Sequence, residues 1–224
     1  MRMFGICGLF AVMAASVLAC HSQLPVLQPQ DDFQSWNDVQ LTVPMTKMFD
    51  FQTRVTMRFG KNATRLNDGR YLIGFVFKPT KSLSITPFYW YINARNSVGQ
   101  FRVENRLSLA VSYRFQFNKT TALVHRSTFE RRLRRPLDTW RYRAALQFEK
   151  DIPKEIIPKA KFFIGDEVFY DSGLKRFSRN RFLVGINKTL SKHLSVDIYY
   201  MRQNDGFSRP GDLHVVWAAW RIKM

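Results

Sequence analysis

Two residues near the middle of the chain, His125 and Ser127, have the types and spacing of a base and a nucleophile. Residues two apart on an extended strand point to the same face. The imidazole could then take the serine proton and activate the hydroxyl for attack on an ester. Glu130 has the opposite parity and would point to the other face. Without an orienting carboxylate, an incidental polar pair is the simpler interpretation.

The His-x-Ser spacing also resembles that of outer-membrane lipid A deacylases. A membrane-embedded hydrolase acting on envelope lipid through His125 and Ser127 is therefore the alternative to a non-enzymatic role. The other histidines, His21, His193 and His214, are scattered, and no HExxH-type spacing occurs. We expect no metal site and no cofactor, and we expect that the protein is not an enzyme.

A second group of candidate residues consists of arginines and carboxylates at alternating positions of extended segments. Charges on one face of such segments can guide an anion or a sugar, or can pair with each other and fill a narrow interior. Unpaired buried charges are costly, so interleaved carboxylates are expected on structural grounds and do not indicate catalysis. The predicted charge ladder of the lumen comprises Arg54, Arg58, Glu104, Arg106, Arg126, Glu130, Arg141, Arg143, Glu149, Glu167, Arg181 and Asp197.

The elements that must position these residues are β-strands. In residues 49 to 59, apolar side chains alternate with polar ones, and a period of two indicates a strand. The pattern recurs, most segments exceed the roughly nine residues that cross a bilayer at a tilt, and many polar faces carry arginine. The predicted strands are 34 to 43, 49 to 60, 70 to 79, 83 to 93, 102 to 117, 120 to 132, 139 to 150, 160 to 171, 179 to 190, 194 to 204 and 212 to 222.

These strands predict an all-β fold, an antiparallel up-and-down transmembrane β-barrel with apolar side chains toward lipid and charges toward the lumen. Short connections alternate with longer ones, as in outer-membrane barrels. Eleven segments conflict with the even strand number usual in bacteria. We therefore expect about 12 strands, with residues 24 to 33 as the extra one, or about 10 if one segment is a bent half of another.

The N-terminus has the features of a secretory signal, with Arg2 followed by an apolar stretch that ends at Ala19. We predict a signal peptide over 1 to 19, a periplasmic leader over 20 to 32 and a barrel domain over 33 to 224. Cleavage after Ala19 and lipidation of Cys20 both remain open. The predicted location is the bacterial outer membrane.

The net charge of +18 raises the question of nucleic acid. The basic residues are mostly spaced along strands and form no recognisable binding motif, so we expect no nucleic-acid partner. The expected partners are outer-membrane lipid, the barrel insertion machinery and a small anionic solute. The chain ends in Met224 instead of the usual aromatic residue, which leaves the insertion signal open. A soluble lipocalin-like barrel is disfavoured because too much apolar surface would face water.

An ordered series of short motifs is similar to a known family. It comprises Asp32-x-x-x-Trp36, Asn105-Arg106, His125-Arg126, Phe129-Glu130-Arg131, Trp140-Arg141-Tyr142-Arg143, Asp166-Glu167-Val168-Phe169, Asn180-Arg181-Phe182 and Tyr199-Tyr200-Met201-Arg202-Gln203. Over residues 32 to 222 the chain resembles the bacterial family called domain of unknown function 2490. The resemblance implies a secreted outer-membrane barrel and implies no ligand or activity. The role therefore remains structural or that of a narrow passive, porin-like pore.

Overall fold

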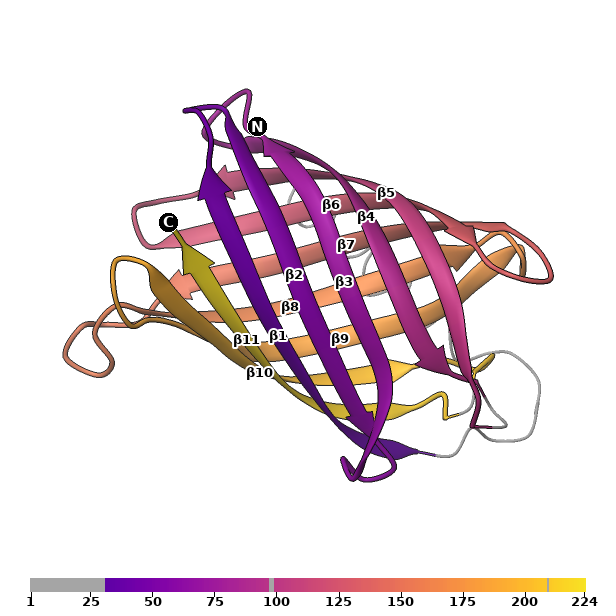
Figure 1. Ribbon diagram of the computed structural model, residues 1–224. Helices are drawn as coiled ribbons and strands as arrows, with labels where there is room; N and C mark the ends of the chain where they lie inside the picture. Colours follow the sequence, from indigo (N-terminus) through magenta and orange to yellow (C-terminus); the bar gives the residue numbers. More distant parts are fainter. Residues whose placement is uncertain (1–30, 97–98, 209) are drawn as a thin grey trace, which may run out of the picture.

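The computed structural model describes residues 31–96, 99–208 and 210–224. In this part of the chain, eleven strands form one closed barrel (Figure 1). They are β1 (Asp32–Pro44), β2 (Phe49–Gly60), β3 (Arg65–Phe77), β4 (Leu83–Arg95), β5 (Phe101–Gln116), β6 (Thr121–Leu133), β7 (Thr139–Asp151), β8 (Ala160–Asp171), β9 (Arg176–Thr189), β10 (Leu194–Asn204) and β11 (Leu213–Lys223).

Each strand pairs with the next in antiparallel fashion, and the barrel closes through a parallel pair, β1 with β11. The closing register runs from Asp32 opposite Leu213 to Thr42 opposite Lys223. Both strands therefore begin at one end of the barrel and finish at the other, where the C-terminus lies beside the end of β1 (Figure 1).

This closure confirms the predicted β-barrel and corrects its strand number. The predictions of 12 strands and of 10 are both wrong for the described chain, because a parallel β1–β11 pair joins an odd number of strands without leaving an edge. All eleven predicted segments are strands. Most of the proposed extra strand, 24 to 33, lies outside the described residues, as do the predicted signal peptide and most of the leader.

The connections differ from the predicted alternation of short turns and long loops. Residues 60 to 69 were expected to form a long loop, but β3 begins at Arg65 and leaves only 61–64 between the strands. Likewise, β9 begins at Arg176, before the expected start at 179. Paired strands satisfy more backbone hydrogen bonds than loops do, so the ladder continues into segments of polar composition.

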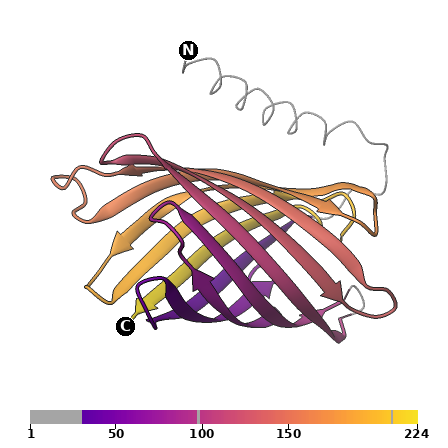
Figure 2. The ribbon, with the colours of Figure 1, turned by 90° about the horizontal axis from the view of Figure 1, so that it is seen from above.

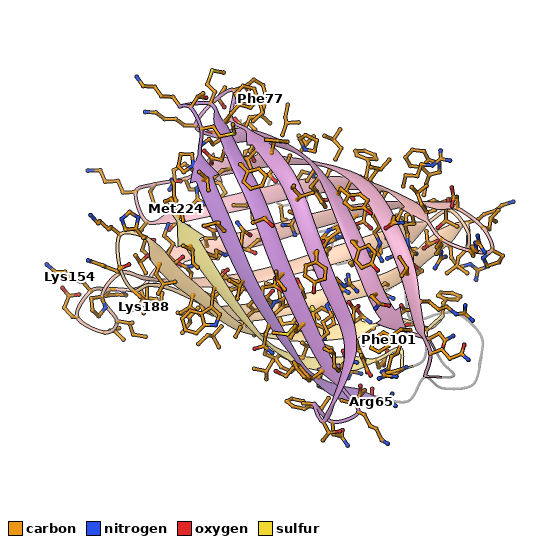
Figure 3. All side chains as sticks on the ribbon, viewed as in Figure 1. Arg65, Phe77, Phe101, Lys154, Lys188 and Met224 are labelled. Atoms are coloured by element: carbon orange, nitrogen blue, oxygen red, sulfur yellow. The ribbon has the colours of Figure 1, made fainter. Side chains whose placement is uncertain are left out.

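Lysine distinguishes the two ends of the barrel. One end holds the connections 45–48, 78–82, 117–120, 152–159 and 190–193 and the end of β11. Eleven of the thirteen lysines lie in or within two residues of these connections or that strand end, and only Lys61 and Lys175 lie elsewhere. We call this the lysine end and the other the far end. In Figure 3, Lys154, Lys188 and Met224 mark the lysine end, and Arg65 and Phe101 mark the far end.

The two faces of the wall differ in chemistry. Along β5, Val103, Leu107 and Leu109 are exposed on the outside, while Arg106 and Ser108 between them are buried inside. The same alternation occurs around the tilted strands seen in Figure 2, and it leaves many large apolar side chains on the outer surface. The described residues form no helix long and apolar enough to cross a membrane.

Candidate anion-binding lumen

A cavity of about 750 Å³ occupies the barrel interior, and every strand contributes residues to its lining. Charge dominates this lining. The lining contains ten arginines and one lysine but only four carboxylates. The cations are Arg54, Arg58, Arg70, Arg106, Arg126, Arg141, Arg143, Arg179, Arg181, Arg221 and Lys161, and the carboxylates are Asp38, Glu149, Glu167 and Asp197.

The structure places ten of the twelve residues of the predicted charge ladder on the cavity lining. These ten are Arg54, Arg58, Arg106, Arg126, Arg141, Arg143, Glu149, Glu167, Arg181 and Asp197. The other two, Glu104 and Glu130, face the same interior and are held by lining arginines. Arg106 Nε lies 2.5 Å from a Glu104 oxygen, and Arg143 Nη1 lies 2.9 Å from a Glu130 oxygen.

Sequence reasoning missed several interior charges. Asp68 and Arg70 fell in or beside a segment predicted as a loop, although they are a buried ion pair at the far end of β3. Asp38 and Arg221 lie on predicted strands, and their parity relative to neighbouring apolar residues could have identified them. Asp171 was missed because the arginines that pair with it are distant in sequence. They are Arg132 on β6 and Arg141 on β7.

Ion pairs form a continuous network across the far half of the lumen. Arg106 connects Glu104 with Glu130, at 2.5 and 3.6 Å. Arg143 then connects Glu130 with Glu167, at 2.9 and 2.7 Å. A second branch leaves Glu104 through Arg132, which also contacts Asp171 at 2.9 Å. Since buried charges must be paired to be tolerated, this alternation explains how so many arginines fit inside.

Aromatic rings complete the packing of the far half. Phe169 is almost fully buried, and four guanidinium groups lie 4.8 to 5.8 Å from its ring centre. The Arg58 guanidinium lies 3.4 Å above the Trp36 ring, and Trp36 packs edge-on against Trp217 at 4.7 Å. Such cation–π contacts favour the charged groups in a site with little water. The far half is therefore a constriction.

The half of the lumen nearer the lysine end is more open to water, and we call it the wider half. Here the side chain of Arg126 is 49% exposed and that of Arg221 39% exposed, whereas Arg106 and Arg132 in the far half are 9% and 7% exposed. Water thus has access to the guanidinium groups of the wider half. The lumen is a basic vestibule that narrows toward the far end.

The loop between β10 and β11 is fixed to the far end by Asp205, which accepts hydrogen bonds from the Arg179 guanidinium and the backbone N–H of Phe207. Burial acts to raise the pKa of Asp205, but the Arg179 charge and the Phe207 N–H lower it below its ordinary value. Asp205 therefore stays ionised at neutral pH and anchors this loop.

The pair His125 and Ser127 lies on the outer wall, away from the lumen. His125 Nε2 and Ser127 Oγ are 3.0 Å apart, and Ser127 Oγ is 2.9 Å from the Tyr142 hydroxyl. In the described chain no carboxylate is hydrogen bonded to this group, and Glu130 is buried on the inner face. Mutual hydrogen bonding satisfies three polar groups on an apolar wall. In the described chain, His, Cys, Asp and Glu form no group of three that could hold a metal ion.

The fold and lumen define a closed, porin-like β-barrel. Residues 33–213 match the model of a family described as a protein of unknown function (DUF2490), so the chain belongs to this family. The resemblance predicted from the motifs is thereby confirmed.

Solved structures with a similar fold include the NanC porin. It has 11% sequence identity and a TM-score of 0.51, and the match covers 85% of this chain and 96% of that one. The KdgM porin matches at 11% identity with a TM-score of 0.46, over 77% of this chain and 90% of that one. At such identities the NanC match shows a shared fold alone. No curated protein matches the sequence.

Proposed function

We propose that this protein is an outer-membrane barrel whose lumen is a narrow, passive path for small anions. The observation that carries this proposal is the cavity lining, in which eleven cations face four carboxylates. Five more carboxylates pair with lining arginines, and the cations still outnumber the carboxylates; these five are Asp68, Glu104, Glu130, Asp171 and Asp205. A cleft of one sign of charge with low-dielectric walls concentrates counter-ions. Anions that enter at the lysine end therefore meet a favourable potential, and cations meet a barrier.

The membrane assignment rests on the outer wall. Large apolar side chains such as Leu107, Trp140 and Ile198 are exposed there, and a contiguous apolar surface of this extent is unfavourable in water. A closed barrel satisfies its backbone groups internally, which is what lipid requires. The porin-like fold and the predicted signal peptide support the outer membrane as the location, with its lipid and the barrel insertion machinery as partners.

The narrow far half determines what the pore can pass. Its arginine and carboxylate side chains are paired and buried, so only small solutes could move between them. If the constriction admits no ions, the barrel is a structural envelope protein with a basic vestibule.

Single-channel conductance of the refolded protein in a planar bilayer tests the pore. A salt gradient across the bilayer reports selectivity, and two salt concentrations report screening of the lumen charge. We expect small discrete steps with a reversal potential on the anion side, and a weaker bias at the higher salt. Silence from protein that is folded and inserted would contradict the pore and favour the structural role.

The alternative is a hydrolase acting on envelope lipid through His125 and Ser127. The 3.0 Å contact between His125 Nε2 and Ser127 Oγ favours it, and so does the position of the pair on the outer wall. In the described chain no carboxylate is hydrogen bonded to the pair, which weighs against a hydrolase.

We expect the substitution Ser127→Ala to leave the acylation of envelope lipid unchanged in cells that make the protein. The Ser127 hydroxyl only forms hydrogen bonds with His125 and Tyr142 on the outer wall, so the barrel should still assemble without it. Mass spectrometry of the extracted lipid, compared with cells that lack the protein, checks this. A loss of deacylation with normal assembly would instead establish the hydrolase.

A further inference from the structure

One guanidinium in the wider half of the lumen, that of Arg126 on β6, has no strong partner. Its ion pair is a long one, 3.7 Å from Arg126 Nη2 to a Glu167 oxygen. Glu167 is already held by Arg143 at 2.7 Å and approached by Arg181 at 3.8 Å. Arg181 also donates to Gln203 at 2.9 Å, whereas Arg126 has only its long contact with Glu167, and about half of the Arg126 side chain is exposed to the cavity.

Two further arginines come from the opposite wall. Arg54 on β2 and Arg221 on β11 flank β1 and share Gln40, whose Oε1 accepts hydrogen bonds from them at 2.5 and 3.0 Å. In the barrel order β6 lies five strands from β1 in one direction and six in the other, so Arg126 faces this pair across the lumen. Arg54, Arg126 and Arg221 all line the same cavity, where like charges repel one another.

Unused donors remain in this group. Arg54 Nε is buried and makes no hydrogen bond. Asp38, 3.5 Å from Arg54, and Asp197, 2.5 Å from Arg221, offset one positive charge each. Because Glu167 is shared with other arginines, the charge of Arg126 is the one left without compensation. An anion between the two walls would relieve this repulsion and take up the free donors.

We infer that the lumen contains a binding site for a phosphate-class oxyanion, formed by Arg54, Arg126 and Arg221. The inference rests on the proposed basic lumen and adds a fixed site to it. Guanidinium groups bind phosphate through parallel N–H donors, which a spherical halide cannot match. The cavity of about 750 Å³ accommodates such an ion, which would enter from the lysine end, where the lumen arginines are more exposed.

Titration of the refolded barrel with inorganic phosphate, at constant ionic strength and with chloride as the reference anion, tests the site. Isothermal calorimetry should show saturable phosphate binding. We expect Arg126→Gln to weaken this binding about tenfold or more, as for the loss of a charge-assisted contact. Arg126→Lys keeps the charge but loses the planar guanidinium. Its phosphate affinity should lie between those of the unchanged protein and Arg126→Gln.

Arg131→Gln provides the matched control, because Arg131 lies on the same strand but points to the outer wall, where it pairs with Asp138 at 3.6 Å. The phosphate affinity of the Arg131→Gln variant should equal that of the unchanged protein. Equal affinity in Arg126→Gln, or no saturable binding by folded protein, would overturn the site.

Conductance separates failure of the site from failure of the pore. Anion-selective currents that phosphate does not block, with no saturable binding, would overturn the site and leave the pore. Saturable binding that depends on Arg126, in a barrel that conducts no ions, would support the site and overturn the pore.

Discussion

Replacing Arg143 by methionine should destabilise the barrel by about 3 to 5 kcal/mol, the cost of breaking a buried ion pair by removing one partner. Arg143 Nη1 donates to Glu130 at 2.9 Å, and its Nε and Nη2 donate to Glu167 at 3.0 and 2.7 Å. Glu130 has no exposed surface and would retain only Arg106, at 3.6 Å. The variant therefore leaves a carboxylate desolvated and nearly unpaired. Urea unfolding in lipid vesicles measures the change in the free energy of unfolding.

Arg131→Met is the control for this substitution. Arg131 also pairs with a carboxylate, but both partners are about half exposed. Exposed pairs contribute about 0 to 1 kcal/mol, so this variant should unfold almost like the unchanged protein. Adding Glu130→Gln to Arg143→Met should recover part of the loss, because it removes the unpaired charge. Equal unfolding free energies for Arg143→Met and Arg131→Met would mean that water solvates Glu130 and that the far half is open.

The strands could be predicted from sequence because a wall between two different environments imposes a period of two on the chain. Segments such as 160–171 and 194–204 coincide with the observed β8 and β10. The beginning of β3 was missed because residues 65 to 69 are mostly polar and include a glycine. Their strand conformation depends on pairing with β2 and β4, which local composition does not encode.

The strand number depends on closure, and closure is not a local property. Counting segments gave eleven, and the expectation of an even number led to the prediction of 12 or 10. The parallel register of β1 with β11, for example Trp36 opposite Trp217, depends on which residues meet around the full circumference. No periodicity in either strand indicates that contact.

The site shows the same division between local and long-range information. Parity along single strands was sufficient to identify inward-facing charges such as Arg106 and Glu167. Pairing was not predictable, because Asp171 is shared by Arg132 from β6 and Arg141 from β7. The weak pairing of Arg126, on which the proposed oxyanion site rests, follows only from the competition of three arginines for Glu167.

The substitution Leu109→Arg should destabilise the barrel in a bilayer by about 2 to 4 kcal/mol, because it places a charge near the lipid midplane. Leu109 lies in the middle of β5, is 42% exposed, and pairs across strands with Phe129, which is also exposed. Unfolding free energy in lipid vesicles and the fraction recovered in the outer membrane should both fall.

The matched substitution Met45→Arg places the same charge outside the predicted lipid zone. Met45 is 62% exposed in a connection at the lysine end, where a cation should cost about 0 to 1 kcal/mol. A clear difference between the two variants would locate the middle of the β5 outer face in lipid. If they unfold alike in vesicles, that face meets water or another protein, and the membrane assignment on which the pore depends would be wrong.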